Sequence, residues 1–279
     1  MKFRIVSDSS SDIFALSEVD FATVPLKVIT DEKEYIDTPD LDVDEMISDL
    51  QKYKGTSKSS CPNMEDWRSA FGDAEAVFCV PITRNLSGSY NSATLACEEY
   101  VEEHPDRKAY VVDTLSAGPG CAILVEKLCA LIAEGLSFEE IRDNLCEYQK
   151  STHLHFCLES LRNFANNGRV SHATAKIAGV IGIRIIGMAS DEGTLEVQSK
   201  ARGAAKAISE MYSKLKEYGY CGGKVRIHHC HGEDAAEALS RMILADYPDA
   251  DIAVRTTGAL CSFYAEEGGF LVGYEGRSR

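Results

Sequence analysis

Short apolar runs alternate with helix-periodic segments along the first half of the chain. The runs at 76–82 (AVFCVPI) and 109–113 (AYVVD) predict buried strands, the first continuously apolar as expected of a strand buried on both faces, and the run at 3–6 (FRIV) predicts a strand that ends in a polar cluster. A further strand is predicted at 24–29 (VPLKVI). Apolar residues recur at helical spacing at 43–50, from Ser89 onward, and near 119–134. Buried strands that alternate with polar loops and helices predict a doubly wound, mostly parallel α/β sheet.

The second half has a different pattern. A helix is predicted at 137–150, and a hairpin at 182–199 turns at Asp191-Glu192-Gly193. Further strands are expected at 152–158, 224–231, 250–256 and 270–275. This half is predicted to be an α/β domain with a mixed or antiparallel sheet. The sequence therefore indicates two domains, residues 1–150 and residues 151–279.

Composition narrows the possible partners and compartment. With 279 residues, 44% of them hydrophobic, the chain can bury a large core. A net charge of −15, and basic runs no longer than two, argue against nucleic-acid binding. There is no 18-residue apolar run, so no membrane span is predicted. The ten cysteines form no CxxC pair, and several lie among apolar residues, which favours free buried thiols and a cytoplasmic location.

Common catalytic signatures are missing from the sequence. It contains no GxxxxGK[ST], no GxGxxG after the first strand, no GxSxG and no HExxH. His228, His229 and His231 lie at one strand end. Because side chains alternate along a strand, His229 and His231 share one face and His228 points to the other, so the spacing supplies no third ligand on either face. Neither a metal nor a cofactor is therefore predicted.

Serine-containing loops are the more informative feature. The loops 7–12, 56–63, 83–89 and 113–120 are all predicted to follow strands, where the ligands of parallel α/β sheets bind. Serine hydroxyls beside helix N-termini suit a carboxylate or a phosphate. The same serines would also serve as ordinary helix caps. The pattern leaves both interpretations open.

At these loops the sequence resembles the bacterial DegV family, fatty-acid-binding proteins that serve fatty acid kinase. IVSDSSSDI (5–13) is similar to the family's opening strand and loop, and KSSCPNMEDW (58–67) to its K-T-S-Q-P-S-P-E-D-F segment. ITRNLSGSYNSA (82–93) resembles S-S-x-L-S-G-T-Y-Q-S-A. Residues 160–171 and 177–203 are similar to its Gly-Gly-Arg segment and following hairpin. The similarities keep their order over nearly the whole chain.

The resemblance implies a long-chain fatty acid in a cavity between two domains, with its carboxylate presented to a separate kinase. By position, Ser59 and Ser87 would bind the carboxylate, and Ser60 would assist. Arg169 would lie on a surface loop that engages the kinase. Tyr264 falls near the place of a family histidine and would bond the carboxylate or the hydroxyls around it. The resemblance thus implies a carrier subunit with no catalytic residue of its own.

Two other functions compete with the carrier. The chain could bind a different small anion as a sensor. It could also be a phosphotransferase or hydrolase with one exposed serine as nucleophile. That enzyme needs a base within hydrogen-bond reach of the serine, and no serine loop carries an obvious histidine partner.

Overall fold

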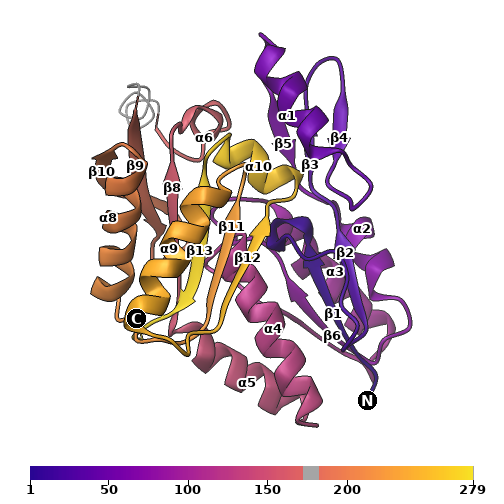
Figure 1. Cartoon of the computed structure of the whole chain (residues 1–279). Coiled ribbons are helices and arrows are strands. Elements are labelled where there is room, and N and C mark those ends of the chain that lie inside the picture. The colour runs from indigo at the N-terminus through magenta and orange to yellow at the C-terminus, as the bar shows by residue number, and fades with distance from the viewer. Residues whose placement is uncertain (172–181, 279) are drawn as a thin grey trace.

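The computed structural model describes residues 1–171 and 182–278, which form three β-sheets with helices packed against them (Figure 1). Residues 177–181, part of the stretch that resembles the family hairpin, lie outside the described residues. The predicted fold class is confirmed: one sheet is parallel and one is mixed.

The first sheet is parallel and has four strands in the order β2-β1-β6-β7. Its strands are β1 (Phe3–Asp8), β2 (Phe21–Val24), β6 (Ala76–Val80) and β7 (Lys108–Val111). Two helices cover each face, α2 (Met64–Phe71) and α3 (Ser89–Glu103) on one, and α4 (Pro119–Ala133) and α5 (Phe138–Gln149) on the other. Every residue of β6 is buried, which explains its unbroken apolar sequence.

The strand predicted at 24–29 is divided between two sheets. β2 ends at Val24, and β3 (Lys27–Ile29) begins a second, antiparallel sheet after Pro25. Proline has no N–H for a strand ladder, so it favours a break there. This sheet has the order β4-β3-β5, with β4 (Glu34–Ile36) and β5 (Lys58–Ser60), and α1 (Val43–Lys52) packs against it.

One of the four serine loops is therefore placed differently from the prediction. Residues 58–60 are strand β5 itself, paired antiparallel with β3. They do not follow a strand of the parallel sheet. β5 has only three residues, so its sequence shows too little alternation of apolar and polar residues to distinguish a strand from a loop.

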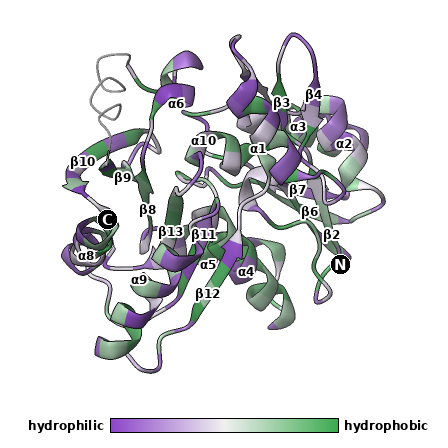
Figure 2. Cartoon of the chain, turned by 45° about the horizontal axis from the view of Figure 1, so that its top comes forward, coloured by the Kyte–Doolittle hydropathy of each residue, from purple (hydrophilic) through white to green (hydrophobic). Residues whose placement is uncertain are grey.

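The third sheet has six strands in the order β10-β9-β8-β13-β11-β12, and only β11 and β12 are parallel. The hairpin predicted at 182–199 is confirmed as β9 and β10. The strands are β8 (Thr152–Leu158), β9 (Ile183–Ala189), β10 (Leu195–Arg202), β11 (Val225–His229), β12 (Ile252–Thr256) and β13 (Phe270–Glu275). β8 is buried along its whole length, and both β8 and β13 include a hydrophobic stretch, which is green in Figure 2. The helices among these strands are α6 (Arg162–Asn166), α8 (Ala204–Glu217), α9 (Glu233–Asp246) and α10 (Ala259–Ala265).

Helix α4 lies between the parallel sheet and the six-stranded sheet and contacts both (Figure 1). Its first turn approaches β13 so closely that a Cβ at Gly273 would come within 2.7 Å of the backbone of Pro119 and Gly120. Only glycine fits this contact between helix and sheet. A helix buried on two sides needs apolar residues all round, and nine of the fifteen α4 residues are buried.

The division into domains at residue 150 stays a prediction. The parallel sheet ends before it and the six-stranded sheet begins after it, at β8. However, α10 comes from the second half of the chain and packs on α1 and β3 of the first half. Two helices, α4 and α10, therefore contact elements from both halves of the chain.

Candidate functional site

A cavity of about 290 Å³ lies where α6, α10, β5 and the loop after β6 meet the six-stranded sheet. Most of its wall is apolar. Along β8, alternate residues Leu154, Phe156 and Leu158 point into it, as the two-residue period of a strand requires. The remaining apolar wall consists of Leu26, Ile82, Leu86, Ala117, Phe164, Leu195, Leu260, Ala265 and Leu271.

The polar lining of this cavity includes every site residue predicted from the sequence. Ser59, Ser60, Ser87 and Tyr264 all border it, and so does Arg169. They come from β5, the loop before α3, α10 and the segment after α6. Residues far apart in the sequence are thus brought together, with apolar side chains on the other sides.

Tyr264 is held by contacts at its hydroxyl and at its ring. Its hydroxyl lies 2.7 Å from Ser59 Oγ, and its ring stacks on Phe164 with centroids 4.5 Å apart. Burial raises the pKa of this phenol, more than the hydrogen bond to Ser59 and the charge of Arg169 lower it. The phenol therefore keeps its proton near neutral pH and can donate a hydrogen bond to an anion.

Ser87 has two roles at once. Its Oγ accepts a hydrogen bond of 3.2 Å from the N–H of Ser89, in the first turn of α3, and it also lines the cavity. Helix α3 has no other side-chain cap at its N-terminus. Capping and ligand contact, the two interpretations of this serine, are therefore compatible.

Arg169 lines the cavity instead of projecting from a surface loop. The side chain is half-buried, and its guanidinium donates to the carbonyls of Leu86 (3.1 Å) and Asn167 (2.5 Å). These bonds use two of the five N–H donors of a guanidinium. The family resemblance implied a surface loop for Arg169, whereas its contact with Leu86 depends on a segment more than 80 residues away.

Buried carboxylates hold the segments that carry these residues, a role not foreseen from the sequence. Asp8 accepts hydrogen bonds from Ile82 N (3.0 Å) and Ser89 Oγ (2.6 Å), on either side of the loop that carries Ser87. Burial raises the pKa of Asp8, although hydrogen bonds from Ser10, Ser89 and the backbone oppose that effect. Its position after a strand was visible in the sequence, but its partners were not.

Two further carboxylates hold α10, the helix that carries Tyr264. Asp37 accepts from the N–H groups of Ala259 (2.7 Å) and Leu260 (3.1 Å), and Asp12 accepts from Gly258 N (2.7 Å). Asp12 also bonds His228 Nδ1 at 2.6 Å. In residues 1–171 and 182–278, no three His, Cys, Asp or Glu side chains are grouped to hold a metal ion.

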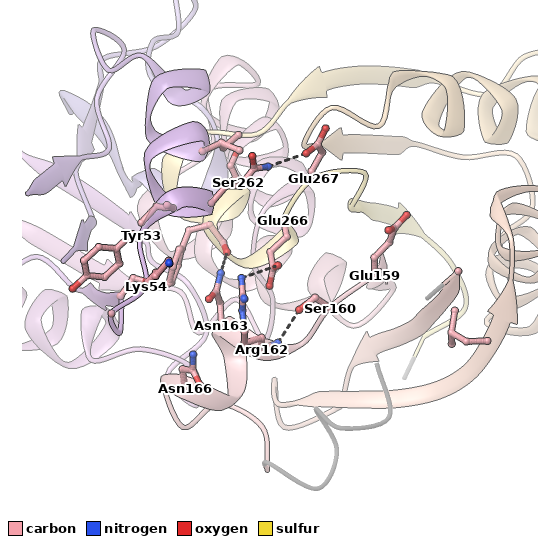
Figure 3. Close-up of a pocket in the computed structure, with 18 residues that line it drawn as sticks. Tyr53, Lys54, Glu159, Ser160, Arg162, Asn163, Asn166, Ser262, Glu266 and Glu267 are labelled. Carbon is pink, nitrogen blue, oxygen red and sulfur yellow. Dashed lines mark hydrogen bonds and ion pairs between the residues drawn. The ribbon is translucent and has the colours of Figure 1, made fainter. Parts of the chain in front are cut away.

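A second, wider cleft of about 720 Å³ lies beside α1, α6 and α10, and Figure 3 shows its polar lining. Arg162 and Glu266 form an ion pair there (3.7 Å), and Glu267 accepts from Gln51 Nε2 (2.9 Å). Because an unpaired carboxylate is costly to bury, both glutamates would be expected to face solvent. Glu267 does, but Glu266 is half-buried, with 23% of its side chain exposed. Charges of both signs make this cleft a poor match for an acyl chain.

All ten cysteines are free thiols, and six of them are buried, as the sequence predicted. Burial raises the pKa of buried thiols such as Cys261, so they stay protonated and unreactive. Among the described residues, no helix has the length and hydropathy needed to cross a membrane.

A largely apolar cavity with clustered hydroxyls and a guanidinium, in an α/β fold of three sheets, defines a binding protein for a small amphipathic ligand. The chain belongs to the DegV family. A family model described as "Uncharacterised protein, DegV family" matches residues 2–276. A DegV domain-containing protein of Streptococcus pneumoniae is 42% identical over 279 residues, covering 99% of each chain.

Two solved structures are similar over nearly the whole chain. A DegV family protein from Eubacterium eligens, loaded with heptadecanoic acid, is 43% identical with a TM-score of 0.96, and the match covers 99% of this chain and 100% of that one. The Fatty Acid Kinase (Fak) B3 protein of Streptococcus pneumoniae, loaded with linoleic acid, is 41% identical, with the same TM-score and coverage.

Proposed function

We propose that this protein binds a long-chain fatty acid in the 290 Å³ cavity and presents its carboxylate to a separate fatty acid kinase. One observation carries the proposal: a single cavity combines an extended apolar wall with a cluster of hydroxyls and one guanidinium. The relatives that hold heptadecanoic and linoleic acid support it.

The apolar wall accounts for the affinity of an acyl chain. About fifteen buried methylenes at ~0.8 kcal/mol each give on the order of 10 kcal/mol before ordering and desolvation are subtracted. A carboxylate is costly to bury without hydrogen bonds, so the head group must be paired. Ser59, Ser87 and Tyr264 supply hydroxyl donors, and Arg169 supplies the charge.

The serine-nucleophile alternative gains no support from the site. Ser59 bonds Tyr264, Ser60 donates to the Cys61 carbonyl (3.4 Å), and Ser87 accepts from the backbone of α3. None of the three hydroxyls contacts a described histidine that could take its proton. In the proposed function, phosphoryl transfer belongs to the kinase, and this chain holds the acceptor.

Native mass spectrometry of the full chain purified from bacteria tests the proposal. We expect a co-purified fatty acid that dissociates under activation. After lipid removal, Ser59→Ala/Ser87→Ala should bind fatty acid roughly 1–3 kcal/mol more weakly than wild type, because each serine pairs a charged group. Ser137→Ala, which alters an exposed cap on α5, is the matched control. Unchanged affinity in the double variant, or a small phosphorylated ligand in place of the lipid, would contradict the proposal.

A further inference from the structure

One row of residues crosses the cavity face of the six-stranded sheet. Leu271 of β13 lies opposite Phe156 of β8, and Phe156 lies opposite Gly187 of β9. Residues directly opposite in an antiparallel pair point to the same face. Leu271 and Phe156 line the cavity, so the missing side chain of Gly187 would lie on that face too.

The ring of Phe156 occupies the space that a side chain at 187 would need. A Cβ built on Gly187 would lie 2.2 Å from Phe156 Cζ and 2.5 Å from Cε2. Non-bonded carbon atoms do not approach each other this closely, so the Phe156 ring lies directly against the backbone of Gly187 on β9. With any side chain at 187, the ring would have to move off β9 and into the cavity.

Phe156 stands in the middle of the apolar wall. On β8 it lies between Leu154 and Leu158, which line the cavity on either side of it. Leu154 lies near the first turn of α4, where Gly120 would place a Cβ 3.6 Å from it. The predicted head-group residues lie on β5, on α10 and before α3 rather than on β8, so in the proposed function a ring at this place limits the width of the cavity beside the acyl chain, not the room for its head group.

We propose that Gly187 and Phe156 together set the mid-chain width of the acyl cavity and so determine which chain shapes the protein accepts. This inference rests on the proposed function, since it concerns an acyl chain in the same cavity. A cis double bond bends the middle of a long chain and needs lateral room, whereas a saturated chain can stay straight. The residue at 187 should thus affect bent chains more than straight ones.

The experiment measures the affinities of oleic acid and palmitic acid for lipid-free full-length protein and its variants. In Gly187→Ala, oleic acid should bind about tenfold more weakly, as overpacking of a cavity predicts, while palmitic acid changes less. Phe156→Leu alone should raise the oleic-to-palmitic affinity ratio at least about threefold. The double variant Gly187→Ala/Phe156→Leu should recover the oleic acid affinity lost in Gly187→Ala.

A matched control separates cavity shape from loss of stability. Ile186→Val alters the neighbouring residue of β9, whose side chain packs in the core on the opposite face. It should leave the ratio unchanged. Gly187→Ala also presses on the Glu196 carbonyl, 2.5 Å from the built Cβ, so this variant could fail to fold. Phe156→Leu adds no volume to the protein, so this variant still tests the inference if Gly187→Ala does not fold.

The outcomes distinguish the two proposals. An unchanged ratio in Phe156→Leu overturns the inference, and so does an equal loss for both acids in a folded Gly187→Ala. A change in Ile186→Val as large as in the cavity variants also overturns it. Wild-type protein that binds neither acid would instead contradict the proposed function.

Discussion

At the scale of single residues, the phenol of Tyr264 has the chemistry of a neutral donor. Its pKa is raised by burial, so it does not titrate near pH 7. A neutral donor gives a weaker bond to a carboxylate than a protonated imidazole would. It also gives a bond that does not depend on pH. The family resemblance puts Tyr264 near a histidine position, and it therefore implies a different pH response for this protein.

We expect fatty-acid affinity to be nearly flat between about pH 5.5 and 7.5, the range in which an ordinary imidazole of pKa ~6.5 titrates. Tyr264→Phe should weaken binding by roughly 1–3 kcal/mol, because it removes a hydrogen bond to a charged group. Displacement of a fluorescent fatty-acid probe, followed across this pH range, measures the affinities of wild type and of Tyr264→Phe. Wild-type affinity in the Phe variant would show that the hydroxyl has no ligand role, and a steep loss with rising pH would point to a histidine.

Arg169 is also a residue-scale case, because its guanidinium borders the cavity beside the predicted head-group residues. We expect Arg169→Ala to slow phosphorylation of the bound acid by the cognate kinase at sub-saturating protein. Arg169→Lys keeps a positive charge but loses the fork of N–H donors. It should therefore recover only part of the rate. Exposed Arg241→Ala serves as control. Equal rates for wild type and Arg169→Ala would remove the claim.

Much of the site could be predicted from local sequence, and the rest depended on distant contacts. Ser59 and Ser87 lie in recognisable segments. The lining role of Arg169 follows from its bond to Leu86, and that of Phe164 from stacking on Tyr264, 100 residues later. Nothing near Arg169 or Phe164 in the sequence encodes these distances. Gly187 likewise has meaning only once β8 is paired beside it.

At the scale of elements, α10 is a short helix held in place by carboxylates from the other half of the chain. Asp37 accepts two of its N-terminal N–H groups. Burial, reinforced by the charge of Asp12, raises the pKa of Asp37 to about 7, although hydrogen bonds from the backbone and Ser9 oppose the shift. The helix that carries Tyr264 is thus anchored by a group that titrates near neutral pH.

This anchor predicts a particular dependence of stability on pH. In the unfolded chain Asp37 titrates near its ordinary pKa of about 4. Between about pH 4 and 7 the unfolded state therefore loses the proton first, and the unfolding free energy falls as pH rises, by at most about 1.4 kcal/mol per pH unit. Above pH 7 this contribution is constant.

Urea denaturation from pH 4.5 to 8 should show the contribution of Asp37 in wild type and its loss in Asp37→Asn, whereas the contribution of Asp8, whose pKa is also raised, stays in both. The difference between their unfolding free energies should change through the window and level off above pH 7. Asp106→Asn, at an exposed aspartate, should run parallel to wild type. Parallel curves for wild type and Asp37→Asn would contradict the assigned role.

Regular elements were predicted better than their pairing. The predicted helix at 119–134 is α4 at Pro119–Ala133, because its apolar residues recur over four turns. In contrast, the run at 24–29 contains the residues of two strands in two sheets. A strand of three residues has too few alternations to state which sheet it joins. Tertiary pairing decides that.

At the scale of the whole molecule, an ion-pair cluster joins α4 to the six-stranded sheet. Arg226 on β11 binds both carboxylate oxygens of Glu126 on α4, at 2.7 and 2.8 Å, and also contacts Asp251. Burial alone would raise the pKa of Glu126, but Arg226 and Lys224 hold it below its usual range. With 8% of its side chain exposed, Arg226 is part of the interior contact between the two halves.

Removing one partner of this cluster should be costly. We expect Arg226→Ala to lower the unfolding free energy by roughly 3 kcal/mol, because it leaves Glu126 partly buried without its main counter-charge. Arg241→Ala, which breaks an exposed pair with Glu237 on α9, should change stability by less than about 1 kcal/mol. Equal losses in chemical denaturation would show that the cluster contributes no more than a surface pair.

The sharing of the cavity wall between the two halves has a consequence for local opening. Ser59 and Leu86 come from the first half, and Phe156, Tyr264 and Leu271 from the second, so an acyl chain in the cavity touches both. Bound lipid then acts as an internal cross-link whose strength depends on its concentration. Amide hydrogens of α10 and β13 should exchange faster in delipidated protein than in loaded protein, while those of α2 and α5, none of whose residues lines the cavity, exchange alike in both. The exchange rates of these backbone amides would thus report whether the protein carries lipid.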